Sequence, residues 1–198
     1  MPPRTLTLRQ LNRATLARQG LLEPFSRAPL ARQIRRLGSL QAQHPDWPPF
    51  ALQSRLGADA PPADLDRTRS RRSVVRATLM RMTVHIVSAE DFWPMSTLSL
   101  PFRVDQWRSW YKLDPATSPL GRRITATHAA VVAAMQERPL AIREIEAIMA
   151  AQLHDVEIPP NRSLWRHVSG ALQLVLVPYP EEGYGRARYV TAEQWLGP

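Results

Sequence analysis

The chain contains no cysteine, only one lysine and no long run of apolar residues. Without cysteine it can form neither disulfides nor thiol-based catalytic or metal sites. No apolar stretch approaches the roughly 20 residues of a membrane-spanning helix, and the first residues lack the apolar core of a signal peptide. These absences favour a soluble, cytoplasmic protein without membrane partners. Its 198 residues suffice for one large domain or two small ones.

Positive charge is abundant and unevenly distributed. Of the 26 basic residues, all but Lys112 are arginine, and the net charge is +9. Residues 1–57 carry a net charge of +7, residues 58–125 carry +4, and residues 126–198 carry −2. A polyanion such as nucleic acid is therefore expected to contact the first two-thirds of the chain. The alternative explanation is a solvated basic surface.

Helical signals fill the first part of the chain. Thr7 and Gln10 form a capping-box pattern at the start of the first amphipathic segment. Gly38 closes a second helix in "APLARQIRRLGSL", and third and fourth helices are expected in "PPFALQSRL" and "PADLDRTRSRR". The β-branched, alternating segment "SVVRATLMRMTVHIV" then predicts strands. Ser88 and Asp91 indicate a further helix start.

The same order of elements recurs later. Helices are expected in "THAAVVAAMQE", "AIREIEAIMAAQL" and "NRSLWRHVSGALQ", followed by a hairpin with a glycine-rich connection in "LVLVPYPEEGYGRARYV". Three helices followed by a hairpin are typical of a winged helix. We therefore predict an α+β, mainly helical fold of tandem winged-helix units, at residues 1–90 and 125–198, with a helical connector at 91–124. A generic α+β core is the alternative for either unit taken alone.

Two glutamines stand close together between helix and turn signals, in "LGSLQAQHPDWPPF". On a helix, the side chains of Gln41 and Gln43 would diverge by about 200°. In extended backbone they would share one face, because successive side chains alternate. Gly38 before them and Pro45 after them favour an extended segment. On spacing alone, two exposed polar residues past a helix end would be the ordinary explanation.

The chain resembles the AlkZ-like winged-helix DNA glycosylases, which excise bulky alkylated purines and can unhook interstrand crosslinks. The similarity lies in "LGSLQAQ", "FALQSRL" and "VVRATLMRMTVHIVSAED". The family motif combines a Gln-apolar-Gln or Gln-apolar-Asp triplet with a strand reading Arg-x-x-x-x-Arg-x-Thr-x-His. In this chain the motif residues are Gln41, Ala42, Gln43, Arg76, Arg81, Thr83 and His85.

The resemblance implies a DNA repair enzyme acting in base excision repair, with Gln41 and Gln43 as catalytic residues. Breaking an N-glycosidic bond builds an oxocarbenium-like sugar. A glutamine is not a base, but its amide can hold and orient a water. That suffices when the leaving base is already cationic, as an N7- or N3-alkylated purine is. Thr83 and His85 are predicted to line the site or orient the triplet, although a lone strand histidine is more often a core residue.

The expected partner is double-stranded DNA, alkylated or crosslinked, bound by a monomer associated with the nucleoid. The residues predicted to contact DNA are arginines of the basic region, namely Arg32, Arg35, Arg36, Arg69, Arg71, Arg72, Arg76 and Arg81. In the second unit, Arg162 and Arg166 would meet phosphates if their helix entered a groove. The net charge of −2 there argues against a main role in binding.

Neither a metal nor another cofactor is expected. His44 and Asp46 lie near the triplet, but two residues in a proline-rich turn do not make a metal site.

Farther along the chain, Trp165 is predicted to be in the core and His167 on the surface. Met82 departs from the family, in which this position is commonly glycine, and methionine would be strained in a turn at positive φ.

Two other classes of function fit the same sequence. Family members usually continue into a further C-terminal segment, whereas this sequence ends at Pro198, so it is expected to be a fragment or a shortened relative. A DNA-binding regulator or damage-binding protein without catalysis is therefore an alternative. A protein-interaction scaffold is the weaker third class, because a winged helix does not by itself determine function.

Overall fold

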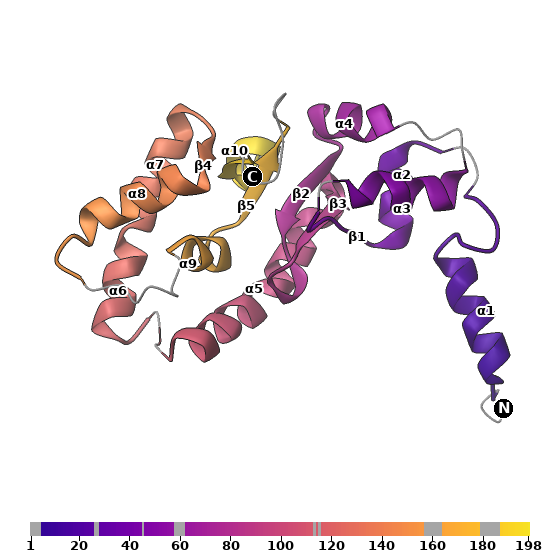
Figure 1. Cartoon of the computed structure of the whole chain (residues 1–198), viewed down its shortest axis with the longest axis horizontal. Helices are drawn as coiled ribbons and strands as arrows, with labels where there is room; N and C mark the ends of the chain where they lie inside the picture. Colours follow the sequence, from indigo (N-terminus) through magenta and orange to yellow (C-terminus); the bar gives the residue numbers. More distant parts are fainter. Residues whose placement is uncertain are drawn as a thin grey trace.

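The chain folds as two successive runs of helices that each end in a β-hairpin (Figure 1). The computed structural model describes residues 5–25, 28–44, 46–57, 62–112, 114, 116–156, 164–178 and 187–198. Among these residues, no helix has both the length and the apolar character needed to cross a membrane.

The first run follows the expected order of helices. Its elements are α1 (Leu8–Arg18), α2 (Leu30–Leu37), β1 (Leu40–Gln41), α3 (Trp47–Leu56), α4 (Pro62–Ser70), β2 (Val74–Thr78) and β3 (Val84–Ser88). The predicted capping box is confirmed, since the side chains of Thr7 and Gln10 each bond to the other residue's backbone N–H. Gly38 ends α2 with φ of 82°, as predicted. The two-residue strand β1 was not predicted.

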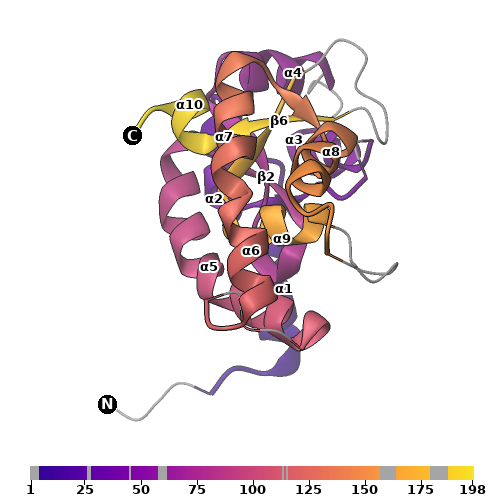
Figure 2. The same ribbon diagram turned by 90° about the vertical axis from the view of Figure 1, so that its left-hand side faces the viewer.

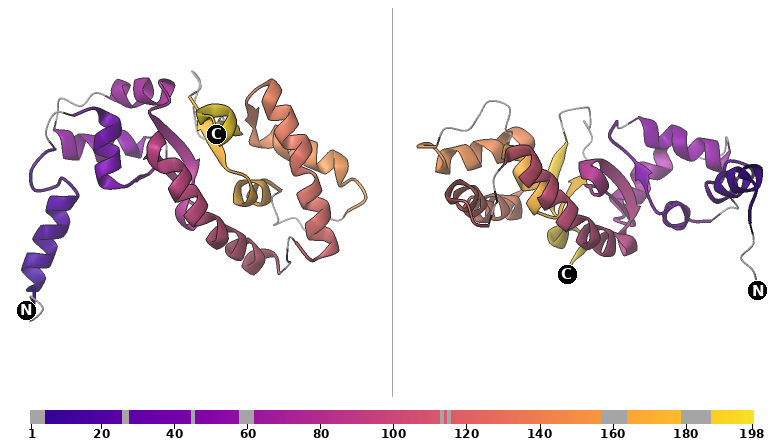
Figure 3. Two further views of the ribbon diagram at one scale, coloured as in Figure 1. Left: turned by 180° about the vertical axis from the view of Figure 1, so that it is seen from behind. Right: turned by 90° about the horizontal axis from the view of Figure 1, so that it is seen from below.

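Helix α1 stands apart from the rest of the chain. Every residue from Leu8 to Arg18 is exposed. Figure 1 and the left view of Figure 3 show this helix projecting away from α2 and α3. Its apolar side chains, among them Leu8 at 73% exposure and Leu11 at 52%, therefore contribute little to the core.

A single long helix, α5 (Ala89–Tyr111), links the two runs. It starts as predicted, because the Ser88 side chain accepts a hydrogen bond from the backbone N–H of Asp91. It then continues through Pro94 and Pro101 for 23 residues. The expected helical connector thus forms one continuous element for most of its length.

The second run repeats the pattern. Its elements are α6 (Pro119–Ala126), α7 (His128–Glu137), β4 (Leu140–Ala141), α8 (Ile142–Gln152), α9 (Leu164–Ala171), β5 (Leu174–Val177), β6 (Arg188–Thr191) and α10 (Ala192–Leu196). Figure 2 shows α6 and α7 following one another along the outer side of this run. The predicted hairpin is confirmed by antiparallel pairing of β5 with β6. Its glycine-rich connection lies outside the described residues.

The six strands found in the described residues form one antiparallel sheet in the order β1-β3-β2-β5-β6-β4. In each run the short strand pairs with the last strand of the hairpin. The hairpins meet where β2 pairs with β5, with Arg76 opposite Leu176 and Ala77 opposite Val175. The predicted mixed, mainly helical fold is confirmed. The division at residues 90 and 124 stays a prediction, since one sheet runs through both units.

Alternation along the strands places different side chains on the two faces of the sheet. Val75, Ala77 and Val87 pack with Phe92 of α5, whereas Val74 and Ile86 pack with α2, α3 and α4. A third apolar cluster lies among α6, α7, α8 and α9 and the strands β4, β5 and β6. The sheet therefore separates a face covered by α5 from a face covered by the early helices, and this separation positions the triplet.

Arg103 ties α5 to both runs from inside the molecule. Its side chain is 1% exposed. One guanidinium nitrogen donates to the carbonyls of Thr78, at 3.1 Å, and Ser169, at 3.4 Å. The other donates to the hydroxyl of Ser96 at 3.3 Å. Burial lowers the Arg103 pKa to about 10, so the group stays cationic at neutral pH while joining the end of β2 to α9.

Candidate active site

The glutamine triplet, Gln41–Ala42–Gln43, lies in extended backbone at the edge of the sheet. Gln41 is opposite His85 in the pairing of β1 with β3, and the Ala42 N–H donates to the Val84 carbonyl at 2.7 Å. Gln41 and Gln43 are exposed, whereas Ala42 is completely buried. This alternation puts both glutamines on one face, which confirms the extended segment expected from their spacing.

The Gln43 side chain is bonded to the neighbouring strand. Its amide oxygen accepts a hydrogen bond from the backbone N–H of Val84 at 3.0 Å. A backbone N–H can only donate, so the partner atom must be the oxygen and the NH₂ group points elsewhere. Gln43 therefore offers mainly N–H donors to a ligand, whereas Gln41 has both its carbonyl and its NH₂ on an exposed side chain.

His85 shares the glutamine face, which we define by Gln41, Gln43, Thr83 and His85. Its Nδ1 lies 2.9 Å from the Thr83 carbonyl oxygen. Since a carbonyl accepts, Nδ1 carries the proton in neutral His85 and Nε2 keeps a lone pair. The His85 side chain is buried, and this burial lowers its pKa below the ordinary value, with a smaller contribution from the Arg81 charge. His85 is therefore neutral at physiological pH.

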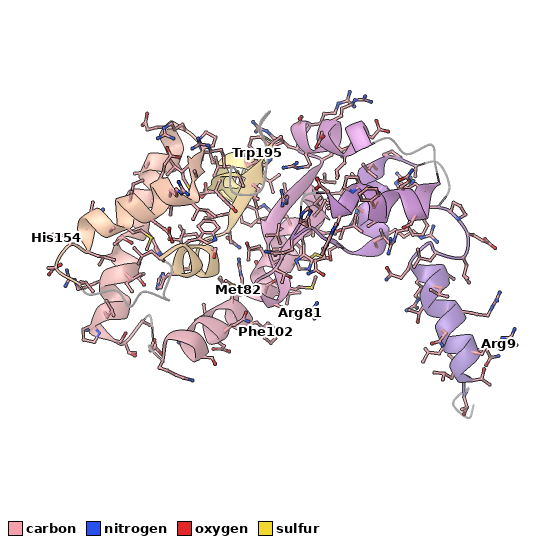
Figure 4. All side chains as sticks on the ribbon, in the orientation of Figure 1. Arg9, Arg81, Met82, Phe102, His154 and Trp195 are labelled. Carbon is pink, nitrogen blue, oxygen red and sulfur yellow. The ribbon has the colours of Figure 1, made fainter. Side chains whose placement is uncertain are left out.

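The turn between β2 and β3 has an unusual backbone. Arg81 and Met82 have φ of 54° and 57°, and the Thr83 N–H closes the turn on the Met80 carbonyl at 3.1 Å. Two successive residues at positive φ are typical of a type I′ hairpin turn. The conformation suspected for Met82 is thus confirmed. In Figure 4, Arg81, Met82 and Phe102 lie near one another on the lower margin of the molecule, and α5 packs on this turn.

Thr83 stabilises this turn with its side chain. Its hydroxyl donates to the Met80 carbonyl at 3.0 Å. Its backbone carbonyl holds Nδ1 of His85, so the turn and the histidine are connected through one residue. The roles predicted for Thr83 and His85 at the site stay predictions.

Arg76 reaches the triplet from the opposite face of the sheet. Its side chain is buried, at 8% exposure. A guanidinium nitrogen, Nη2, donates to the carbonyl oxygen of Ala42 at 3.0 Å. The sequence associated Arg76 with DNA contact, which stays a prediction, while this bond to the middle of the triplet could not be foreseen from the motif.

The other predicted DNA-binding arginines differ in what they touch. Arg32, Arg71 and Arg81 are exposed. Arg35 is exposed too, but it pairs with Glu90 and, at 3.3 Å, with Asp91 at the start of α5.

Three further arginines of the predicted set pack against protein groups. Arg36 lies over the Phe25 ring, 4.3 Å from its centroid. Arg72 lies at the same distance from the Trp195 ring and donates to the Trp195 carbonyl at 3.0 Å. Arg69 is buried, 3.6 Å from Asp66. Their contacts with DNA stay predictions.

Exposed aromatic side chains follow the triplet along the chain. Trp47, at 59% exposure, stacks on His44 with ring centroids 5.5 Å apart. Phe50, three residues farther along α3, is 68% exposed. His44 and Asp46 are 3.5 Å apart, and the described residues contain no cluster of three or more His, Asp or Glu side chains that could hold a metal ion.

In the second run, the placement predicted for His167 was wrong. His167 is 4% exposed, and its Nδ1 lies 2.8 Å from Nε2 of His128, which is also buried. Three successive residues of α9, from His167 to Ser169, are buried, so this helix is covered on more than one side. Trp165 packs on Tyr189, 4.4 Å between ring centroids. Arg162 and the Arg166 side chain fall outside what the structure describes.

Comparisons with known proteins agree with these features. A family model for DNA glycosylase AlkZ-like proteins matches residues 34–198. Among solved structures, the fold is similar to that of Streptomyces sahachiroi DNA glycosylase AlkZ, with a TM-score of 0.73 and 20% sequence identity. The match covers 98% of this chain and 52% of that protein, so the chain spans about half of its length. No curated protein sequence matches. Because the family model covers most of its length, the chain belongs to the AlkZ-like DNA glycosylase family.

Proposed function

We propose that this protein is a DNA repair glycosylase that binds duplex DNA and hydrolyses the N-glycosidic bond of cationic N7- or N3-alkylated purines, leaving an abasic site. One observation carries this proposal within the family. Gln41 and Gln43 share one exposed face of an extended segment, while the intervening Ala42 is fully buried. Two amides are thereby presented together from the edge of the sheet, where a nucleotide can reach them.

The chemistry of the leaving base sets the substrate class. A neutral base needs either protonation or strong stabilisation of the departing anion, and a positioned acid or base typically contributes 10²–10⁴-fold in rate. Each tenfold in rate corresponds to about 1.4 kcal/mol of barrier. An amide pair supplies neither acid nor base. A cationic alkylpurine leaves as a neutral molecule, so placement of water and a polar site can suffice.

The two glutamines have different parts in this proposal. The Gln43 carbonyl is occupied by the Val84 N–H, so Gln43 donates through its NH₂ group. Gln41, opposite His85, keeps its carbonyl for accepting a hydrogen bond from the attacking water. Neutral His85 adds a lone pair on the same face, which can receive a hydrogen bond from the Gln41 amide or from water.

DNA approaches through the positive part of the chain in this proposal. Exposed arginines, with Arg32, Arg71 and Arg81 foremost, contact phosphates. Trp47 and Phe50 supply exposed aromatic faces beside the triplet on which bases can stack. The described structure gives these side chains exposure far above that of core aromatics such as Phe92, at 1%.

The decisive experiment is single-turnover excision of 7-methylguanine from duplex DNA. Gln41→Ala and Gln43→Ala should each lose about 10²-fold or more in rate while folding and DNA affinity are retained, because water or base positioning is lost. Gln43→Asp should keep partial activity, since a carboxylate oxygen can still accept from the Val84 N–H. Asp46→Asn should change the rate little.

The controls separate this mechanism from acid–base catalysis. If Asp46→Asn abolished excision and the glutamine variants stayed active, Asp46 would be the general base and the amide mechanism would be wrong. Release of uracil by the unaltered protein at a comparable rate would contradict the leaving-group argument.

A DNA-binding protein without catalysis is the second candidate. It is favoured by the engagement of the Gln43 carbonyl with the Val84 N–H within the sheet. Incubation with methylated DNA followed by mild alkali distinguishes the two, because strand breaks arise only where abasic sites were made.

A further inference from the structure

The regular pattern of backbone hydrogen bonds in the ladder of β1 and β3 is interrupted at the middle of the triplet. In an antiparallel ladder, a hydrogen-bonded pair of residues exchanges two backbone bonds. The Ala42 N–H donates to the Val84 carbonyl at 2.7 Å, which is the first of these bonds. The Val84 N–H does not return to Ala42, because it donates to the Gln43 side chain at 3.0 Å. The Ala42 carbonyl therefore needs another donor.

Arg76 provides that donor across an intervening strand. It lies on β2, two strands away from β1, with Ile86 of β3 between them and opposite to it. Its side chain crosses β3 on the face covered by the early helices and donates through Nη2 to the Ala42 carbonyl at 3.0 Å. Ala42 is completely buried, so water cannot replace this bond.

We propose that Arg76 is a positioning residue that holds the triplet extended, so that Gln41 and Gln43 stay together on the glutamine face. This inference rests on the proposed function. The two side-chain hydrogen bonds depend on each other. Because the Gln43 side chain accepts from the Val84 N–H, the Ala42 carbonyl has no donor on β3, and the Arg76 guanidinium donates to it instead. Without Arg76 the Ala42 carbonyl loses the one charged donor that the described residues give it, and Gln43 loses its defined direction.

The position of Arg76 distinguishes this role from phosphate binding. Arg76 is opposite Ile86 in the ladder, whereas Gln41 is opposite His85. Neighbouring residues of β3 point to opposite faces, so Arg76 and the glutamines lie on opposite sides of the sheet. At 8% exposure the guanidinium has little surface to offer a phosphate.

The test measures excision, DNA affinity and amide exchange for Arg76→Met and Arg76→Lys. Arg76→Met should lower the single-turnover rate at saturating protein at least tenfold, while the Kd for DNA and its salt dependence stay unchanged. Hydrogen exchange at the Ala42 amide should accelerate. Arg76→Lys keeps a cationic donor group without the planar guanidinium and should be intermediate in both readouts. If Arg76→Met does not fold, Arg76→Lys alone carries the comparison.

A matched control and a double variant exclude a general loss of structure. Arg103→Met removes another buried arginine that donates to backbone carbonyls, those of Thr78 and Ser169 and not one of the triplet. It should lower stability without changing the excision rate or Ala42 exchange. In a Gln41→Ala background, Arg76→Met should cost much less than it does alone, because the two residues act as one unit.

Two results would overturn the inference. A weaker Kd with a salt slope reduced by about one phosphate, at an unchanged saturating rate, would make Arg76 a phosphate contact. Unchanged Ala42 exchange in both Arg76 variants would show that it does not hold the triplet. Failure of the proposed function has a different signature, namely no excision by the unaltered protein, and the exchange measurement then still tests the positioning.

Discussion

Met82 occupies a backbone conformation that suits glycine better than methionine. Its φ of 57° follows the 54° of Arg81 in the turn between β2 and β3. A residue with a Cβ is destabilised by roughly 1–2 kcal/mol in the left-handed region. Glycine avoids this strain, and its cost is mainly the larger conformational entropy that it loses on folding. We expect Met82→Gly to raise the free energy of unfolding by about 0.5–1 kcal/mol, measured by urea denaturation.

Met80 provides the matched comparison for this prediction. It lies in the same turn and is also partly exposed, but its φ is not positive. Met80→Gly should therefore lower the free energy of unfolding. Equal effects of the two substitutions would show that the backbone conformation at Met82 is not under strain.

At the residue scale, spacing predicted the arrangement of the glutamines but not the atoms that they use. Two residues apart in extended backbone must share a face, and Gln41 and Gln43 do. The hydrogen bond from the Val84 N–H to Gln43 depends on a strand 41 residues farther along the chain. The bond from Arg76 to Ala42 likewise joins residues 34 positions apart. No local pattern encodes either one.

At the element scale, helices α7 and α9 are joined by two buried histidines. Burial lowers the pKa of His128 to about 4 and that of His167 to about 3, with the His128 charge lowering the latter further. Both rings are therefore neutral at pH 7, and only one hydrogen lies between Nε2 of His128 and Nδ1 of His167. The ordinary histidine pKa of 6.5 applies once the chain unfolds.

This histidine pair predicts an acid-sensitive fold. Between about pH 6.5 and pH 4 the unfolded chain binds more protons than the folded one, so stability is complete above pH 6.5 and is lost as the pH falls. The loss should be on the order of 2 kcal/mol per histidine between pH 7.5 and pH 5. Denaturant unfolding at several pH values above 5, where few carboxylates titrate, measures it.

A double variant tests the assignment. His128→Gln combined with His167→Gln should unfold more easily at pH 7.5 but show a much flatter pH dependence down to pH 5. Parallel curves for the variant and the unaltered protein would place the acid sensitivity in other groups. Sequence reasoning missed this pair because its two members lie 39 residues apart and a lone histidine on a helix carries no burial signal.

At the scale of the whole molecule, the charge gradient follows the order of the two runs. The net charge of +7 in residues 1–57 and +4 in residues 58–125 contrasts with −2 in the remainder. If the first run binds DNA, affinity should fall steeply with salt, because each neutralised phosphate contributes about −0.9 to the slope of log K against log salt. Fluorescence anisotropy with an unmodified duplex at several salt concentrations measures this slope.

Two arginines, one from each hairpin, test which run binds DNA. Arg81 is exposed in the turn of the first hairpin, whereas Arg188 begins β6 and pairs with Glu144. Arg81→Gln should weaken DNA binding and reduce the salt slope by about 1, and Arg188→Gln should change both little. The opposite ranking would show that the second run is the one that binds DNA. An affinity independent of salt would exclude a phosphate-binding surface.

The sequence by itself determined most of the helices, several of their caps and the two hairpins. Helix ends depend on interactions within a few residues, so the sequence alone predicts them correctly. Examples are the Thr7 capping box, Gly38 at the end of α2 and Ser88 at the start of α5. The family motif likewise placed the candidate site in the first run, within the region that the family model matches.

Only the tertiary structure decided which strands pair and which polar groups hydrogen-bond to one another. The pairing of β2 with β5 merges two hairpins about 100 residues apart into one sheet. Backbone N–H and C=O groups are the same in every strand, so local sequence does not specify which edges meet. The same holds for the buried partners of Arg76, Gln43 and His167, because a side chain's hydrogen-bond partner is fixed by what the whole fold brings within about 3 Å of it.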